Sequence, residues 1–159
     1  MAFDMKMEGL EELSAILGRL DSEAELVASG ALYEGAGVIA DAMSNAVDSI
    51  KTAPFKYKRE SRMPSPEEKE ALRGKIGIAK FRKNGSEVDT IVGFTRGNGY
   101  VMLGKRKTAV RLIARSINSG TSFMGKQPVF RRAASKNKSA AEAAIVAKAE
   151  KMLQEITGN

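Results

Sequence analysis

The chain has 159 residues, of which 43% are hydrophobic and 28% are charged, and its formal net charge is +7. This size and composition suit one globular domain, so we expect residues 1–159 to form a single domain. Cysteine and histidine are both absent, which excludes disulfides, thiolate zinc sites and Ser-His or Cys-His nucleophile pairs. No Asp/Glu cluster has ligand-like spacing. We therefore expect no catalytic residue, metal, cofactor or small-molecule substrate.

The sequence gives no sign of membrane insertion or export. It contains no run of about 18 apolar residues, so we expect no transmembrane helix. Its start lacks the apolar block of a signal peptide, and we expect the protein to stay in the compartment where it is made.

Charge is distributed unevenly along the chain. Residues 1–50 contain two basic and ten acidic residues, residues 51–138 contain 22 and six, and residues 139–159 contain two and three. One interpretation is an ordinary solvated surface. The sharper one is a dipolar subunit, whose acidic face meets a neighbour's basic face or whose basic face meets DNA.

The first part of the chain is expected to be helical. Leucines at positions 10, 13, 17 and 20 form one apolar stripe of a short helix. Ser22 and Glu25 then form a capping box for a long helix over residues 23–50. Glycines at positions 30, 35 and 37 each cost about 1 kcal/mol in a helix. Close approach of another backbone is one reason to tolerate them, and a frayed first turn or a kink is the other. Ser65, Pro66 and Glu68 predict the start of the next, short helix.

Residues 52–64 are expected to form a flexible basic loop, because Pro54 and Pro64 break regular structure. Its basic residues, which interleave with Phe55 and Tyr57, are Lys56, Lys58, Arg59 and Arg62. Such a mixture can grip phosphates and stack bases, and it is also typical of a mobile assembly loop. Both interpretations remain hypotheses.

The apolar period changes to two after Gly74. Strands are expected at residues 76–78, 88–94 and 100–103, and Asn84-Gly85 is a strong hairpin turn between the first two. Lys105, Arg106 and Lys107 are expected in a loop, followed by helices over residues 109–117 and 129–156. The predicted fold class is α+β, with a small antiparallel sheet of three to four strands packed by two long helices from the N- and C-terminal parts.

Residues 120–127 imitate a phosphate-binding loop, since they match the pattern G-x-x-x-x-G-K. Gln127, however, stands where a serine or threonine would bind magnesium. Pro128 disfavours a helix at Gln127, and a helical pattern precedes the segment instead of a strand. We therefore predict no nucleotide site here.

The segment from Ile117 to Ala134 resembles a pattern in the HK-ninety-seven gp-ten-like family of phage tail components. The shared features are Gly120, Thr121 and Ser122, then Gln127 and Pro128, then Phe130, Arg131, Arg132 and Ala133 at the start of the last helix. The leucine stripe at residues 10–20 and the order of elements are also similar to the family.

The resemblance implies a tail-completion protein of a siphophage, which acts by assembly at the junction of head and tail. Its expected partners are tail-tube, terminator or head-connector proteins, and it is expected to form or bind a ring. Its expected location is the host cytoplasm during assembly and then the neck of the virion. Tail terminator and head-closure protein are the alternative roles in this class.

The candidate contact residues combine the basic segments with the shared block. They are Lys56, Lys58, Arg59, Arg62, Lys105, Arg106, Lys107, Gly120, Thr121, Ser122, Gln127 and Pro128. The rival hypothesis is a nucleic-acid-binding module that uses residues 51–62 and 104–115.

Overall fold

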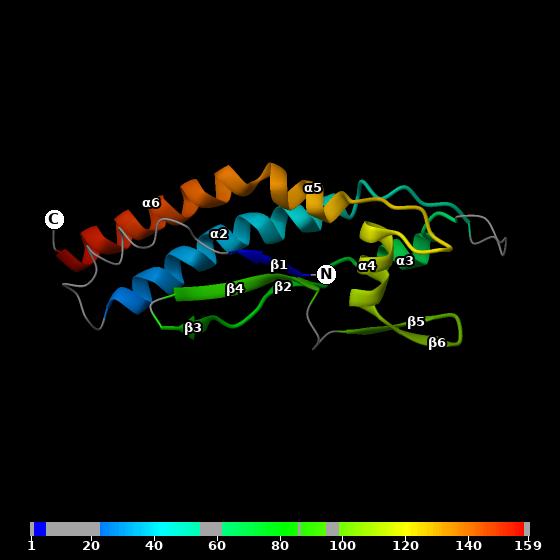
Figure 1. Ribbon diagram of the computed structural model, residues 1–159, viewed down its shortest axis with the longest axis horizontal. Coiled ribbons are helices and arrows are strands. Elements are labelled where there is room, and N and C mark those ends of the chain that lie inside the picture. The colour runs from blue at the N-terminus through cyan, green and yellow to red at the C-terminus, as the bar shows by residue number, and fades with distance from the viewer. Residues whose placement is uncertain (1, 6–22, 55–61, 86, 95–98, 158–159) are drawn as a thin grey trace.

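The computed structural model describes residues 2–5, 23–54, 62–85, 87–94 and 99–157. In chain order its elements are β1 (Ala2–Met5), α2 (Ala24–Ala46), α3 (Pro66–Glu70), β2 (Ile76–Ile78), β3 (Arg82–Asn84), β4 (Glu87–Phe94), β5 (Tyr100–Leu103), β6 (Arg106–Ala109), α4 (Val110–Ser119), α5 (Val129–Lys136) and α6 (Lys138–Thr157). Figure 1 shows an elongated molecule in which α6, α2 and the main sheet lie in succession, with α3, α4 and the β5–β6 hairpin at one end. The predicted α+β class, with long helices from both terminal parts, is confirmed.

Strand β4 is the centre of the main sheet. It pairs antiparallel with β1, β2 and β3. Gly85, in the predicted turn between β3 and β4, has a φ of 66°, which explains the glycine at this position. Thr90, Val92 and Phe94 are buried, as their predicted alternation on one face of the strand requires.

Helix α2 packs against the sheet on one side and against α6 on the other. Towards the sheet, Ile39 and Met43 share a core cluster with Val92 of β4. Towards α6, Val27 and Leu32 lie in a second cluster that also contains Ile145 and Ala149. The core therefore divides between the two faces of one helix.

Small residues set the distance between α2 and α6. A Cβ added to Gly35 would lie 2.9 Å from the carbonyl oxygen of Ala141 and would overlap the side chain of Ile145. The close approach predicted for the glycines is therefore present at Gly35. A Cβ on Gly37 would meet no atom within 4 Å, so packing does not explain that glycine.

The prediction of one final helix over residues 129–156 is wrong at Asn137, where α5 gives way to α6 (Figure 1). The side-chain Nδ2 of Asn137 donates to the carbonyl oxygen of Ala133 at 2.9 Å. Its backbone N–H is 3.2 Å from the carbonyl oxygens of both Ala133 and Ala134. A side chain that bonds to the preceding turn commonly bends a helix.

Two further elements differ from the prediction. Helix α2 ends at Ala46 rather than at residue 50. Residues 47–50 continue in tighter turns, in which the Val47 N–H donates to the carbonyl oxygen of Ser44. Strand β1 was not predicted: its four residues are too few to show a clear period. The helix predicted over residues 9–20 and the cap at Ser22 lie outside the described residues.

Candidate interaction surface

Residues 120–128 form a tight connector between α4 and α5. Gly120 has a φ of 76°, a left-handed conformation that glycine adopts without strain. Thr121 and Met124 exchange backbone hydrogen bonds of 2.9 and 3.3 Å, and the Thr121 hydroxyl accepts the N–H of Phe123 at 3.2 Å. Ser122 is exposed. The segment therefore joins helix to helix, and it follows a helix, unlike a phosphate-binding loop.

The connector also holds both ends of the 52–64 segment. Gln127 pairs with the backbone of Lys51 as a neighbouring strand would: its Oε1 accepts the Lys51 N–H and its Nε2 donates to the Lys51 carbonyl, both at 2.9 Å. At the other end, the Arg62 N–H donates to the carbonyl of Phe123 at 2.8 Å, and the Gly125 N–H donates to the carbonyl of Arg62 at 3.1 Å. Gln127 is thus a structural clamp.

Arg62 is engaged in an internal ion pair. Its Nη1 and Nη2 bind the two carboxylate oxygens of Glu68 at 2.6 and 2.7 Å. The same carboxylate accepts the Ser65 N–H at 2.8 Å, and the Ser65 hydroxyl accepts the Glu68 N–H, which completes the predicted capping box. Burial raises the pKa of Glu68, but the hydrogen bonds from Arg62 and Ser65 and the charge of Arg62 outweigh it, so this pKa lies below its ordinary value.

The loop prediction for the basic residues after β5 is wrong. Lys105 lies in a turn after Gly104, but Arg106 and Lys107 belong to β6, which pairs antiparallel with β5 in a separate two-stranded sheet. The sequence Arg-Lys-Thr-Ala shows no apolar alternation. Strand β6 forms because β5 supplies its backbone hydrogen-bond partners.

The hairpin has two different faces. Val101 and Leu103 are partly buried against the core cluster that includes α4. Tyr100 and Met102 point the other way and are 62% and 63% exposed. Lys107 stands opposite Met102 in the register, and its Nζ lies 4.9 Å from the centre of the Tyr100 ring. We call Tyr100, Met102 and Lys107 the hairpin outer face.

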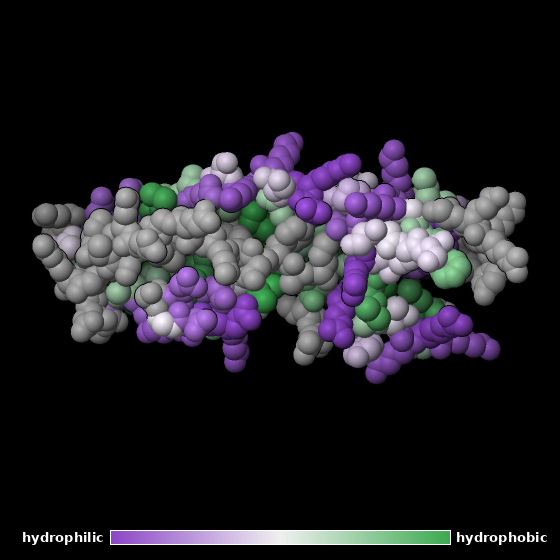
Figure 2. All heavy atoms as spheres, viewed as in Figure 1, coloured by the Kyte–Doolittle hydropathy of each residue, from purple (hydrophilic) through white to green (hydrophobic). Residues whose placement is uncertain are grey.

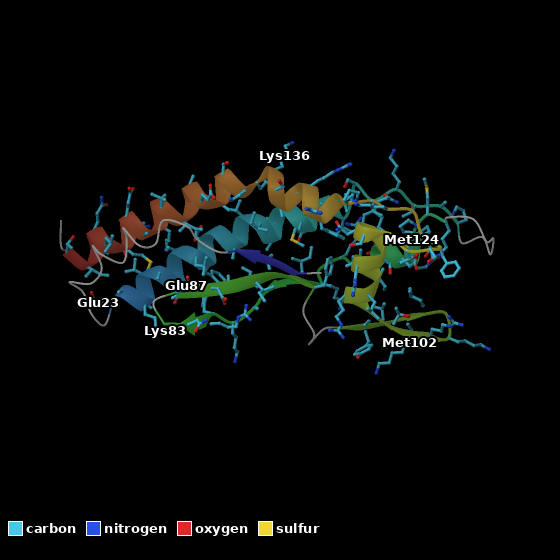
Figure 3. The ribbon with its side chains drawn as sticks, viewed as in Figure 1. Glu23, Lys83, Glu87, Met102, Met124 and Lys136 are labelled. Atoms are coloured by element: carbon cyan, nitrogen blue, oxygen red, sulfur yellow. The ribbon has the colours of Figure 1, made fainter. Side chains whose placement is uncertain are left out.

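Exposed apolar side chains gather at this end of the molecule. Of the eight large hydrophobic residues that are exposed in the described part of the chain, five belong to the hairpin, to α4, to the connector or to the residue before Pro64: Tyr100, Met102, Leu112, Phe123 and Met63. Figure 3 shows Met102 and the buried Met124 at this end, with Glu23 and Lys83 towards the other. Clustered exposed apolar residues mark interaction surfaces.

Basic residues crowd the same end. Between Asp89 and Glu142 the sequence contains 11 basic residues and no acidic one. Figure 2 shows hydrophilic residues in a band from α5 across α4 to the hairpin. We define the cationic band by six exposed residues that make no ion pair with any described residue: Lys105, Arg106, Arg111, Arg115, Arg131 and Arg132.

A shallow pocket of about 350 Å³ lies beside the connector. Three of its lining residues are cations, namely Lys51, Lys126 and Arg132. The other lining residues are Ser49, Met63, Gly125, Gln127, Pro128 and Val129. The described residues contain no group of three or more acidic side chains that could hold a metal ion. No described helix is both long and apolar enough to cross a membrane.

The structure separates the predicted contact residues into three groups. Lys105, Arg106 and Lys107 are exposed at the surface, whereas Arg62, Gly120, Thr121, Gln127 and Pro128 shape or clamp the connector and Ser122 is merely exposed there. Lys56, Lys58 and Arg59 lie outside the described residues. The predicted contacts did not include Tyr100, Met102, Arg131 or Arg132. The long stretch of sequence without a carboxylate could have indicated the two arginines.

Comparison of the chain with protein-family models, with curated proteins and with solved structures found no match.

Proposed function

We propose that this protein is a structural assembly subunit of a tailed-phage virion, a tail-completion or neck component that acts at the head–tail junction without catalysis. Two lines of argument support the proposal. One is the resemblance of residues 117–134 to the tail-component family. The other is the gathering of exposed apolar and basic side chains on one projecting end of the molecule.

The hairpin outer face is the observation that carries this proposal. A two-stranded hairpin is only marginally stable alone, and its edges leave backbone groups unpaired. Here it displays Tyr100 and Met102, residue types that are enriched at protein–protein interfaces, next to Lys107. Exposing such a surface costs stability, and a partner that covers it explains why it is kept.

Charge complementarity suits contact between copies of the chain. The exposed residues Glu34 and Asp41 of α2 make no ion pair with a described residue, and they lie on a different element from Lys107 of the hairpin outer face. A head-to-tail contact between unlike surfaces closes into a ring when its rotation allows. A homo-oligomeric ring at the tail end, assembled in the host cytoplasm, is the form that we propose.

The test is sedimentation of the full chain alone and mixed with the connector, terminator or tail-tube protein encoded in the same genome. We expect a faster-sedimenting complex with at least one of them. The variant Tyr100→Ser/Met102→Ser should weaken that complex at least tenfold, because large desolvated side chains dominate interface energies. The matched control Leu26→Ser/Val146→Ser removes two side chains that are 65% and 56% exposed elsewhere, and should bind normally.

A chain that stays monomeric and binds none of these proteins contradicts the proposal. Equal losses in the hairpin variant and in the control contradict the role of the hairpin outer face. Which partner binds decides among tail completion, tail termination and head closure.

A further inference from the structure

The cationic band and the hairpin outer face lie on different sides of the same hairpin. Successive residues of a strand point to opposite faces, so Arg106 lies on the side of Val101 and Leu103 while Lys107 lies with Tyr100 and Met102. Lys105 extends the band at the turn. A partner on the outer face therefore leaves Lys105, Arg106 and the arginines of α4 uncovered.

The band continues from the hairpin onto α4 and α5. In α4, Val110, Ile113 and Ile117 are buried, which turns Arg111 and Arg115 to solvent one helical turn apart. The Arg131 N–H donates to Asn118 Oδ1 at 3.2 Å, and this bond places the start of α5 beside the end of α4. Figure 2 shows hydrophilic side chains over α5, over α4 and along the hairpin, with pale and hydrophobic residues between the last two.

The stretch of sequence that supplies the six cations contains no carboxylate, since none occurs between Asp89 and Glu142. Helix α2, which carries Glu34 and Asp41, packs against α5, and in α3 Glu68 is held by Arg62 and Glu70 by Arg73. Glu67 remains exposed there. Close, unneutralised cations repel one another, and this repulsion is relieved when a polyanion binds.

The composition of the band favours nucleic acid over an acidic protein. The band contains five arginines, and the planar guanidinium of arginine binds phosphate oxygens in pairs. Protein partners require several large apolar anchors. At the hairpin these stand on the opposite face, and on α4 the exposed large apolar side chain beside the arginines is Leu112. One face of the Tyr100 ring is already covered by Lys107, so the aromatic platform that single strands use is not free on that face.

We propose that the cationic band binds the phosphate backbone of double-stranded DNA without sequence preference. The six cations contact phosphates along an extended strip, and no base is read. This inference is independent of the proposed assembly function, because a chain that binds DNA but no phage protein leaves it standing.

The experiment measures fluorescence anisotropy of a labelled 30-base-pair duplex of random sequence with the full chain, from 50 to 300 mM NaCl. Six phosphate contacts predict a slope of about −5 for the logarithm of the association constant against the logarithm of salt concentration. Arg111→Ala/Arg115→Ala should weaken binding more than tenfold at 100 mM NaCl and reduce the steepness of that slope by about two.

Two further variants keep the result interpretable. Lys80→Ala/Lys151→Ala removes the same two charges from exposed positions outside the band and should change affinity less than threefold. Arg111→Lys/Arg115→Lys keeps the charge and should retain binding within about fivefold. Thermal unfolding of every variant checks that the fold is intact.

The proposal is overturned if the duplex does not bind at 50 mM NaCl, or if the control variant loses as much affinity as the arginine variant. Displacement of the duplex by polyglutamate at equal charge concentration also overturns it, because the band then takes an acidic protein. Retention of DNA in the presence of polyglutamate supports it.

Discussion

The two ends of this elongated molecule differ in their packing and in their surface chemistry. At the α2–α6 end, small residues let two helices pack closely, and surface charges such as Lys83 and Glu25 pair at 2.6 Å. At the end with α4 and the hairpin, a buried core of large side chains supports a surface of exposed apolar residues and cations without ion pairs. Packing of buried side chains thus stabilises both ends. Exposed apolar residues and cations without ion pairs lie mainly at the end with α4 and the hairpin.

This contrast separates two kinds of substitution. Changes in buried side chains or in the α2–α6 contact should alter the free energy of unfolding. Changes in the hairpin outer face or in the cationic band should leave that free energy nearly constant and alter binding instead. Three substitutions, taken in order of decreasing expected effect, test the prediction for buried side chains and for the α2–α6 contact.

The largest effect is expected at Phe130, which is fully buried and packs edge-to-face on Phe94, with ring centres 5.0 Å apart. Phe130→Ala should lower the free energy of unfolding by about 4 kcal/mol, because it removes a large side chain and leaves a cavity. Phe123→Ala, at a position 67% exposed in the adjacent connector, should change it by less than about 0.5 kcal/mol. Urea unfolding monitored by circular dichroism measures both, and similar losses would contradict the assignment of Phe123 to the surface.

The next effect is expected at Glu68. Glu68→Ala removes the carboxylate that binds the partly buried Arg62 and the Ser65 N–H, and should cost about 3 kcal/mol. Because the folded pKa of Glu68 lies below its ordinary value, its contribution is fully present above that ordinary value and is lost as pH falls through the folded pKa. Wild-type stability should therefore decline below about pH 4.3.

The pH dependence has its own control. Glu68→Gln should show a shallower decline of the free energy of unfolding between pH 5 and pH 3. Glu87→Gln, at an exposed position at the start of β4, should keep the wild-type curve. If the wild-type and Glu68→Gln curves run parallel, the ion pair is not the source of the acid sensitivity.

The smallest stability effect distinguishes two glycines of α2. Gly35→Ala should destabilise by about 1–2 kcal/mol, because the new methyl group meets Ile145 and the carbonyl of Ala141 across the helix contact. Gly37→Ala, which meets nothing within 4 Å, should stabilise by up to about 1 kcal/mol through helix propensity. Thermal unfolding measures the pair, and a shift of the same sign in both would mean that α6 does not set the requirement at Gly35.

Local signals in the sequence predict much of the fold. Ser65, Pro66 and Glu68 specify the start of α3 through short-range hydrogen bonds, and Gly85 specifies the turn between β3 and β4 through its positive φ, whereas Asn84 lies in β3 and pairs with Glu87. Alternation along residues 88–94 identifies β4 because one face of that strand is buried. These features depend on residues that are close together in the sequence, so they can be predicted from the sequence alone.

The parts that escaped prediction depend on distant partners or on single side chains. Strand β6 exists through pairing with β5, and β1 through pairing with β4. The break at Asn137 follows from one amide that bonds to Ala133.

The candidate surface was only half predictable. Lys105, Arg106 and Lys107 are visible as a basic run, but the separation of Arg106 from Lys107 onto opposite faces requires the hairpin. The structural roles of Arg62 and Gln127 appear only through contacts with Glu68 and Lys51.

The most direct test of the proposed assembly role is hydrogen exchange of the backbone amides in the full chain, alone and bound to the connector or tail-tube protein encoded in the same genome. We expect binding to slow exchange in residues 100–109 and around the exposed turn at residues 121–123, and to leave exchange at the α2–α6 contact unchanged. Protection confined to α2 and α6, with unaltered exchange in the hairpin, would contradict it.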